Sequence, residues 1–333
     1  MRFRVFVTGS GIVQDAQDLL KAAGGTLMQG DPEDSSVDIE RKVSSFRPDA
    51  LIVRQGQIND LVIRASDKLT VICKHGMGTD NIDINAASDR DIPVMYTPDA
   101  TCESVAEHAL ALILSLIRKI PDQDRMIRCG NFEKKRYGGQ DLLGKTLGLI
   151  GFGRIARRLS ELVAPFSMKV LVYHPSSTEE ALPPYICKVS SITDILSQSD
   201  IVSLHVPLTS DTEGMIDSDA FASMKKDAYL INTARGPLVN EDHLIKALRD
   251  GQIKGAAIDT FEVEPPAADS PLYKLNNVVL TMHTAGNSDS SLQNMAMESV
   301  RNVLSALRNE PLDPRMVING EKISEDRMRG SRK

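Results

Sequence analysis

The residues Thr146-Leu-Gly-Leu-Ile-Gly-Phe-Gly-Arg-Ile-Ala156 carry the clearest structural signal in the chain. A short apolar run ends at Gly151, Phe152 and Gly153, and an apolar helical pattern starts directly after them. This order predicts the strand, tight turn and helix start of a dinucleotide-binding βαβ unit. Gly151 permits the turn, Gly153 lets the backbone approach a pyrophosphate, and the small Ala156 lets helix and strand pack. Free N–H groups and the helix dipole favour a phosphate at this point, so we expect a bound dinucleotide.

Composition limits the classes of protein to which the chain can belong. Its 333 residues suggest about two domains. Hydrophobic residues at 41% and charged residues at 25% are typical of a water-soluble globular protein. The net charge of −6 argues against a nucleic-acid surface.

The cysteines and the start of the chain bear on its compartment. The four cysteines are scattered and include no Cys-x-x-Cys pair, so we expect neither a disulfide framework nor a metal site. Met1 leads directly into the strand-like residues 3–7 without a signal-peptide pattern, and no apolar run is long enough to span a bilayer. We therefore expect a cytoplasmic protein with reduced thiols, no membrane contact and no nucleic-acid partner.

Strand-like and helix-like segments alternate along most of the chain, which predicts mainly parallel sheets with helices on both faces. The first series has expected strands at residues 5–8, 51–53, 71–73 and 94–96 and expected helices around 13–23, 37–46, 61–65 and 82–88. An apolar helix is expected at 103–120 and a loop at 130–139. The second series has expected strands at 147–150, 170–173, 201–204, 229–232, 256–258 and 278–281, followed by a helix at 288–308. The predicted fold class is therefore α/β with two doubly wound parallel sheets, and we expect the polar residues 321–333 to be frayed.

A second glycine turn, Thr8-Gly-Ser-Gly11, also lies between a strand and a helix. Gln14 occupies the position where a dinucleotide turn needs its third small residue. We therefore interpret this segment as an ordinary turn that binds no dinucleotide.

The residue expected at the adenosine ribose lies about 20 residues beyond the glycine turn. This position holds His174, whereas an NAD-specific site has Asp or Glu there, and no arginine for an NADP phosphate lies nearby. Glu179 and Glu180 follow closely and would repel a 2′-phosphate. NAD is therefore the favoured cofactor, and NADP is the alternative.

Charged side chains follow three consecutive strands of the second series. Arg235 follows the first of these strands, Asp259 and Glu264 follow the next, and His283 follows the third. Ligands bind at this edge of open α/β sheets, although a single histidine at a strand end is as often structural as functional. Three consecutive strands that deliver Arg, Glu and His therefore indicate a catalytic site beside the cofactor.

Seven motifs together resemble the D-isomer-specific 2-hydroxyacid dehydrogenase family, which includes phosphoglycerate dehydrogenases and glyoxylate/hydroxypyruvate reductases. They are His75-Gly-Met-Gly-Thr-Asp-Asn-Ile-Asp83, Ser104-Val-Ala-Glu-His108, residues 148–156, His205-Val-Pro-Leu-Thr209, and residues 232–236, 259–265 and 283–286. The resemblance implies a Rossmann cofactor domain, residues 99–289, inserted into a flavodoxin-like substrate domain, residues 1–98 plus 290–333. It also implies a homodimer built on the cofactor domains.

The resemblance implies that His283 is the acid/base, that Glu264 orients it, and that Arg235 holds the carboxylate and carbonyl of the substrate. Each role agrees with the chemistry. Hydride loss from C2 of a hydroxy acid requires removal of the hydroxyl proton, and histidine titrates in the useful range. A carboxylate on the other ring nitrogen fixes the tautomer and stabilises imidazolium, while arginine offers forked donors to a 2-oxo acid.

The remaining expected contacts also come from this resemblance. The expected cofactor contacts are Gly151, Phe152, Gly153, Arg154, Ile155, His174, Val206, Pro207, Thr212, Thr233, Ala234, Arg235, Asp259, His283 and Gly286. The expected substrate contacts are Arg54, Lys74, Met77, Gly78, Arg235 and His283. Asp259 would accept the nicotinamide carboxamide, and Arg54 resembles the arginine that phosphoglycerate dehydrogenases direct at a distal phosphate. The alternative, that Arg54 and Lys74 are solvated basic residues, stays open.

These observations predict an oxidoreductase that transfers a hydride between a nicotinamide cofactor and a small D-2-hydroxy acid or 2-oxo acid. The expected substrates are of the 3-phosphoglycerate, hydroxypyruvate or glyoxylate type. The alternative is a dimeric, NAD-sensing corepressor that uses the same fold as an interaction module. The lack of a basic run in the body of the chain favours the enzyme.

Overall fold

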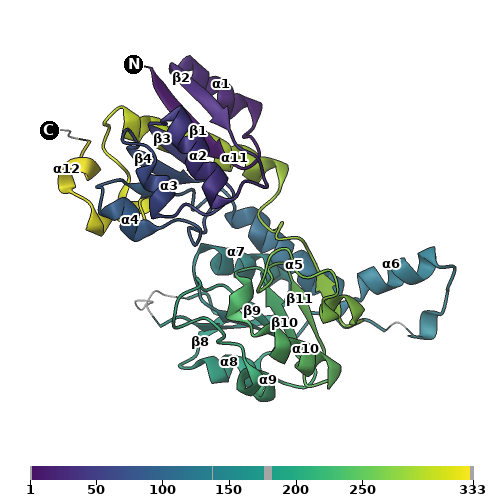
Figure 1. The fold of residues 1–333 in the computed structure, drawn as a ribbon. Coiled ribbons are helices and arrows are strands. Elements are labelled where there is room, and N and C mark those ends of the chain that lie inside the picture. Colours follow the sequence, from purple (N-terminus) through teal and green to yellow (C-terminus); the bar gives the residue numbers. More distant parts are fainter. Residues whose placement is uncertain (1, 137, 176–181, 331–333) are drawn as a thin grey trace. The chain divides into compact units, whose positions relative to one another are not determined.

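The computed structural model describes residues 2–136, 138–175 and 182–330 (Figure 1). The chain forms two compact units, which we call the split unit, Met1–Thr101 with Asn287–Lys333, and the continuous unit, Cys102–Gly286. The boundaries expected from the sequence, 98/99 and 289/290, lie close to these breaks. The assignment of a substrate role and a cofactor role to the two domains stays a prediction.

The split unit contains a five-stranded parallel sheet with the order β2-β1-β3-β4-β5. The strands are β1 (Phe3–Thr8), β2 (Gly25–Gln29), β3 (Ala50–Val53), β4 (Val71–Lys74) and β5 (Val94–Met95). The helices are α1 (Gln14–Ala22), α2 (Ser36–Phe46), α3 (Asp60–Arg64), α4 (Ile84–Ser88) and α11 (Asp289–Leu307). This strand order is that of flavodoxin-like doubly wound sheets.

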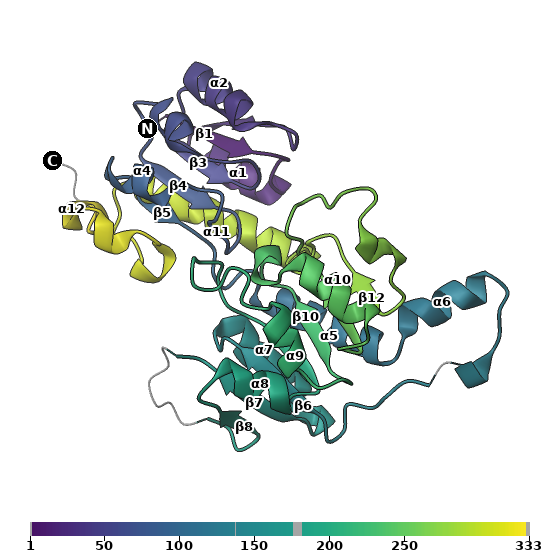
Figure 2. The same cartoon turned by 60° about the horizontal axis from the view of Figure 1, so that its bottom comes forward.

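Alternating buried side chains explain why helices cover both faces of this sheet. Val5 of β1 belongs to the core that contains Leu20 of α1 and Val300 of α11. The next residue, Phe6, belongs to the core that contains Ile39 of α2. Successive side chains of a strand point to opposite faces, so a wholly apolar strand requires a helix layer on each side. Figure 2 shows α11 beside β4, although the two elements lie far apart in the sequence.

The C-terminal segment corrects one expectation. Residues 321–330 are ordered, in η6 (Gly320–Lys322) and α12 (Glu325–Met328), which follow η5 (Pro314–Met316). Asn319 accepts a hydrogen bond from Val94 N (2.8 Å) and donates one to Ile92 O (3.0 Å). Arg327 donates to the carbonyl oxygens of Asp91 (3.2 Å) and Thr70 (2.5 Å). The prediction of a frayed end was wrong for residues 321–330, because polar side chains bond to backbone groups near β5; residues 331–333 lie outside the described part.

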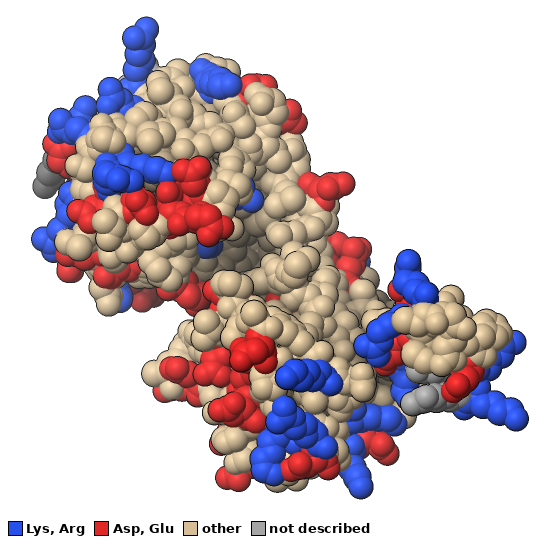
Figure 3. Space-filling view, turned by 45° about the vertical axis from the view of Figure 1, so that its right-hand side comes forward, with Lys and Arg blue, Asp and Glu red and all other residues tan. Residues whose placement is uncertain are grey.

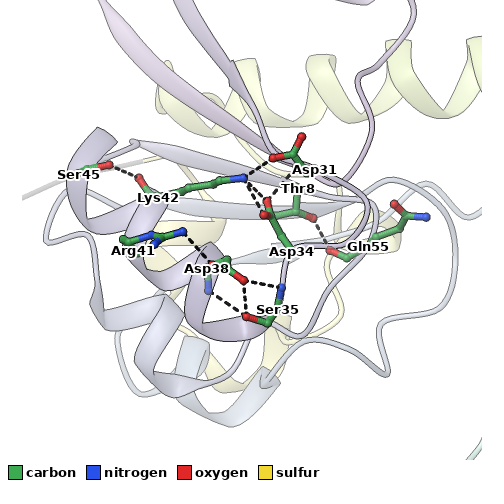
Figure 4. A network of polar contacts seen from close by, with 9 residues as sticks. All are labelled: Thr8, Asp31, Asp34, Ser35, Asp38, Arg41, Lys42, Ser45 and Gln55. Carbon is green, nitrogen blue, oxygen red and sulfur yellow. Dashed lines mark hydrogen bonds and ion pairs between the residues drawn. The ribbon is translucent and has the colours of Figure 1, made fainter.

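A polar network closes the loop between β2 and α2 in the split unit (Figure 4). Lys42 of α2 donates to Asp31 (2.7 Å) and to Asp34 (2.6 Å), and these hydrogen bonds raise the pKa of Lys42. Ser35 caps α2 by accepting a hydrogen bond from Asp38 N. The network occupies the carboxyl end of β2 with the chain's own side chains.

The continuous unit contains a seven-stranded parallel sheet with the order β12-β11-β10-β9-β6-β7-β8. The strands are β6 (Thr146–Ile150), β7 (Lys169–Tyr173), β8 (Ile186–Lys188), β9 (Ile201–Leu204), β10 (Tyr229–Asn232), β11 (Gly255–Ile258) and β12 (Val278–Leu280). The order reverses between β6 and β9, which is the topological switch point where such sheets bind ligands. The α/β class with two parallel sheets is therefore confirmed.

Helices cover both faces of this sheet as well. They are α5 (Cys102–Ile117), α6 (Ile120–Arg128), α7 (Arg154–Val163), α8 (Ile192–Gln198), α9 (Ser218–Ser223) and α10 (Glu241–Arg249). Short 3-10 helices are η1 (Lys134–Arg136), η2 (Ala164–Phe166), η3 (Gly236–Leu238) and η4 (Pro271–Lys274). Leu149 of β6 belongs to the core with α5 and α7, whereas Ile150 belongs to the core with α8, α9 and α10.

Two parts of the sheets and one helix differ from the sequence pattern. The pattern misses β2 and β8, which are edge strands with few buried residues and therefore lack an apolar run. The helix expected at 103–120 ends at Ile117, and α6 begins at Ile120 with Pro121 in its first turn. None of the nine described residues of α6 is buried, and Figures 1 and 2 show this helix apart from the other helices of its unit.

Within the described residues, no helix is long and apolar enough to cross a membrane. The same residues contain no group of three His, Cys, Asp or Glu side chains that could hold a metal ion. Figure 3 shows one face, on which basic and acidic side chains are interspersed on both units.

Candidate active site

The turn after β6 has the space and polarity that a pyrophosphate needs. Gly151 has φ +91°, and a Cβ atom there would lie 2.4 Å from His205 O, so the turn packs directly on the end of β9. Gly153 is the N-cap of α7, with no side-chain cap among the described residues. A Cβ at Gly153 would meet none of the described residues within 4 Å, and Ala156 is buried. The N-terminus of α7 therefore lacks a side-chain cap among the described residues and has open space beside Gly153, so the residues present fit a dinucleotide phosphate.

Four other predicted cofactor positions follow β7 and β9, the two strands that flank β6. His174 follows β7 and is half-buried, and Glu179 and Glu180 lie outside the described residues. After β9, Thr212 donates to Pro207 O (2.7 Å) and accepts from Thr209 N (2.8 Å), so its hydroxyl closes the loop that also carries Val206. The contacts of His174, Val206, Pro207 and Thr212 with a cofactor stay predictions.

Asn232 shapes the loop after β10 and is a site residue that the sequence analysis missed. Its buried amide donates to Arg235 O (2.8 Å) and accepts from Ala234 N (3.0 Å). The Arg235 guanidinium donates to Ala234 O (2.7 Å). Thr233 Oγ1 is buried without a hydrogen-bond partner among the described residues, as expected of a group that bonds to a ligand. A polar amide at the end of an apolar strand was the available signal for Asn232.

The loops after β10 and β11 touch each other through Gly236. A Cβ atom at Gly236 would lie 1.8 Å from Phe261 O, so only glycine fits against this backbone. The contact sets Arg235 against the loop that carries Glu264. Arg235 and Glu264 therefore lie on two loops that meet at the same edge of the sheet.

Glu264 and His283 form a hydrogen-bonded acid–base pair. His283 Nδ1 lies 2.8 Å from Glu264 Oε2, and Glu264 Oε1 accepts from Phe261 N (3.0 Å). Partial burial raises the pKa of Glu264, but the hydrogen bonds from His283 and Phe261 outweigh it, so the pKa is lowered overall. Both side chains remain more than a third exposed, at 37% for Glu264 and 47% for His283. Glu264 is therefore ionised and its carboxylate fixes Nδ1 of His283, while both side chains remain accessible from solvent.

Asp259 is fully buried below His283. Its carboxylate accepts hydrogen bonds from the Thr281 hydroxyl (2.6 Å), Thr284 N (3.0 Å) and Ala285 N (3.0 Å). These bonds tie it to the segment that ends at Gly286. The role of Asp259 toward a nicotinamide carboxamide and that of Gly286 toward the cofactor stay predictions.

The predicted substrate residues of the split unit lie at the carboxyl ends of β3 and β4. Arg54 Nη1 donates to Ser10 O (2.7 Å) and Ser10 Oγ (2.6 Å), and burial lowers the pKa of this guanidinium. Lys74 Nζ donates to Asn81 Oδ1 (2.9 Å) and Arg54 O (3.3 Å). Met77 and Gly78 follow β4 and are half-buried. Arg54 and Lys74 are therefore bonded within the unit, and the substrate role of all four residues stays a prediction.

His75, which directly follows β4, is buried and poorly suited to carry a charge. Burial, together with the charges of Arg54 and Lys74, lowers the pKa of His75 to about 4. Burial also lowers the pKa of His205, after β9, to about 4. Both imidazoles are neutral at pH 7, so neither matches the titration range that an acid/base needs.

The strand order defines a doubly wound α/β protein, and the glycine turn at its switch point fits a dinucleotide. Residues 110–285, more than half of the chain, match the family model described as D-isomer specific 2-hydroxyacid dehydrogenase, NAD binding domain. The chain therefore belongs to the D-isomer specific 2-hydroxyacid dehydrogenase family, as its motifs predicted.

Two curated relatives and one solved structure illustrate this membership. D-3-phosphoglycerate dehydrogenase of Archaeoglobus fulgidus is 37% identical over 279 residues, which are 84% of this chain and 53% of the relative. Glyoxylate reductase of Thermofilum pendens is 39% identical over 272 residues, which are 80% of this chain and 79% of the relative. The chain spans about half the length of the phosphoglycerate dehydrogenases that it matches. The TT0316 protein of Thermus thermophilus has a TM-score of 0.87 and 31% identity, covering 95% of this chain and 99% of that chain.

Proposed function

We propose that the protein interconverts a small D-2-hydroxy acid and its 2-oxo acid by hydride transfer to and from a nicotinamide cofactor. The observation that carries the proposal is the Glu264–His283 pair, at 2.8 Å, on the same edge of the sheet as Arg235 and the Gly151 turn. A base fixed by a carboxylate and an arginine near it are the groups that oxidation of a hydroxy acid requires.

The chain's own residues supply proton transfer and orientation. His283 Nδ1–H donates to the lowered-pKa carboxylate of Glu264, so Nε2 is the ring nitrogen left to take the hydroxyl proton or return it. Glu264 stabilises the imidazolium that results. Arg235, held by Asn232 and Gly236, would bind the carboxylate and carbonyl of the acid through its planar fork. The nicotinamide ring, when bound, accepts or donates the hydride.

We infer that the cofactor lies on the Gly151–Gly153 turn with its pyrophosphate at the N-terminus of α7. The uncapped helix, the open space above Gly153 and the unpartnered hydroxyl of Thr233 support this placement. NAD is the preferred form in this proposal, and NADP is the alternative, because the ribose position holds His174 instead of a carboxylate. Paired titrations with NADH and NADPH, read by cofactor fluorescence, decide between them.

The substrate class in this proposal is a small 2-oxo acid such as glyoxylate or hydroxypyruvate, or a 3-phosphoglycerate-type hydroxy acid. The names of the two relatives support this range. The test is a rate screen of glyoxylate and hydroxypyruvate with NADH and NADPH, and of 3-phosphoglycerate with NAD and NADP. A His283→Asn variant should lose nearly all turnover and keep its cofactor affinity. A folded, cofactor-bound protein without turnover on any of these acids would favour the corepressor-like alternative.

We also propose a cytoplasmic homodimer. All four cysteines are free thiols, in keeping with a reducing compartment. Ile120 and Ile127 of α6 are about half exposed, at 52% and 54%. Exposed apolar side chains on a helix without buried residues suit an interface. Sedimentation of the full chain and of an Ile127→Glu variant tests this, and a monomer at micromolar concentration in the unsubstituted protein would refute it.

A further inference from the structure

The backbone of His283 needs to be held in place. His283 has φ +52°, in the left-handed region, which costs a residue other than glycine roughly 1–2 kcal/mol. Such a conformation persists only where the surroundings determine it. Here three consecutive N–H groups point at Asp259: His283 N donates to its carbonyl oxygen (2.7 Å), and Thr284 N and Ala285 N donate to its carboxylate. The unusual backbone of His283 therefore depends on one buried residue, which holds His283 through its carbonyl oxygen and the next two peptide groups through its carboxylate.

Thr281 and His108 complete the surroundings of that carboxylate. The Thr281 hydroxyl donates its single hydrogen to Asp259 Oδ1, at 2.6 Å. His108 Nε2 lies 3.2 Å from Thr281 Oγ1 and 3.6 Å from Asp259 Oδ1. Because the hydroxyl hydrogen is already used, Thr281 accepts from His108, which assigns the proton of His108 to Nε2. The three side chains thus form a directed chain of hydrogen bonds from His108 to Thr281 to Asp259.

His108 reaches this position from a different part of the unit. It lies on α5, between the buried Val105 and Leu112, and α5 packs against β11 and β12. Its side chain is 25% exposed, whereas Asp259 is fully buried. A buried carboxylate requires donors on each oxygen, and removing a donor costs more than the hydrogen bond itself stabilises. His108 on α5 therefore holds the Thr281 hydroxyl by a hydrogen bond, and that hydroxyl in turn holds the carboxylate of Asp259.

We infer that His108 and Thr281 are positioning residues for the catalytic His283, acting through the buried Asp259. His108 holds the hydroxyl rotamer of Thr281, Thr281 holds one carboxylate oxygen, and the carboxylate holds the peptide groups that follow His283. The role in turnover rests on the proposed function, whereas the role in holding the 283–285 backbone stands on these contacts alone.

The test replaces His108 and Thr281 in the full-length chain and follows two separate readouts. His108→Leu and Thr281→Val remove the hydrogen bonds, and His108→Gln keeps an amide donor in reach of the Thr281 hydroxyl. We expect the Leu and Val variants to lower kcat by roughly 10- to 100-fold, the range that a displaced catalytic group produces. The KM for the cofactor should change less than kcat, because the Gly151 turn is untouched, and His108→Gln should restore most of kcat.

The second readout needs no turnover. Amide hydrogen exchange at residues 283–285 should become at least about 10-fold faster in His108→Leu and Thr281→Val, while amides of β6 keep their protection. Ser115→Ala, on the same helix two turns further on, is the matched control and should change neither readout. If the unsubstituted protein shows no dehydrogenase activity, the proposed function fails and the exchange readout still decides this inference. Unchanged exchange at 283–285 together with unchanged kcat overturns the inference. If His108→Leu loses protection at all amides, that variant is unfolded as a whole, and the result for Thr281→Val then decides.

Discussion

The turn after β1 and the turn after β6 share the pattern Gly-x-Gly between a buried strand and a helix, yet their surroundings are opposite. In the first turn Arg54 donates to Ser10 O, and the positions above the glycines are filled: a Cβ at Gly9 or Gly11 would meet the side chains of Gln55 or Gln29 within 3 Å. The first turn of α1 also carries an acidic residue, Asp15. Carbonyl groups that bind a guanidinium next to an acidic helix start do not suit an anion.

In the second turn the nearest contacts are with backbone, and the space beside Gly153 is open. Gly151 packs on the carbonyl of His205, and nothing described lies within 4 Å of a Cβ at Gly153. The first turn of α7 has no acidic residue and contains Arg154. The difference teaches that a Gly-x-Gly pattern leaves room for a cofactor only where the surrounding side chains do not fill the space beside the glycines.

Gly151→Ala should have the largest effect. The left-handed φ costs about 1–2 kcal/mol, and the clash with His205 O adds about 1–3 kcal/mol, so we expect the free energy of unfolding to fall by about 2–5 kcal/mol. The cofactor Kd should rise at least about 10-fold. Gly9→Ala is the matched variant: its neighbour is the flexible Gln55 side chain, so the stability loss should be smaller and the Kd unchanged. An equal rise of the cofactor Kd in Gly151→Ala and Gly9→Ala would contradict the assignment of the cofactor to the second turn alone.

Arg54→Met should disturb the first turn alone. It removes charge-assisted hydrogen bonds to Ser10, so urea unfolding should show a loss of about 1–3 kcal/mol with no change in cofactor Kd. Arg41→Met breaks only an exposed ion pair with Asp38 and should cost less than about 1 kcal/mol. Weaker cofactor binding in Arg54→Met would contradict the view that the first turn takes no part in cofactor binding.

Gly153→Ala should separate folding from cofactor binding. A methyl group at this position meets no atom of the described residues within 4 Å and requires no unusual φ, so stability should change by less than about 1 kcal/mol. It occupies the space where a pyrophosphate would approach, so the cofactor Kd should rise about 10-fold, which is about 1.4 kcal/mol. Gly138→Ala, also in open space, is the control for a neutral methyl group. An unaltered Kd in Gly153→Ala would place the pyrophosphate elsewhere.

Glu264→Gln should give the smallest change in stability, and one that depends on pH. A carboxyl whose pKa is lowered in the folded state adds stability above its ordinary value of 4.5, and this contribution is lost as the pH falls through the folded value. The difference between the two proteins should therefore be full at pH 7, stay below about 1 kcal/mol because the pair is partly exposed, and shrink below about pH 4.5. Denaturant unfolding at pH 7 and at about pH 3.5 measures it, and a difference that grows in acid would contradict the ion pair.

Much of the site could be predicted because parallel strands bring their carboxyl ends to one edge. The apolar runs of β10, β11 and β12 were enough to place Arg235, Glu264 and His283 on that edge. The pattern could not show that Gly236 shapes the Arg235 loop, because Gly236 acts by contact with the neighbouring loop at Phe261. Nor could it show that Asp259 bonds to the segment around His283. Asn232 acts within its own loop, and its polar amide at the strand end was a local signal.

Local physical rules, read along the sequence, determined the alternation of strands and helices, the dinucleotide turn and the residues that follow each strand, because apolar periodicity and glycine sterics act over a few residues. The tertiary structure alone decided which glycine turn stays open, how the C-terminal residues 321–330 are ordered, and how His108 reaches Thr281 from 173 positions away. Those outcomes depend on which side chains the folded core brings into contact, and no local pattern encodes a contact across such a separation.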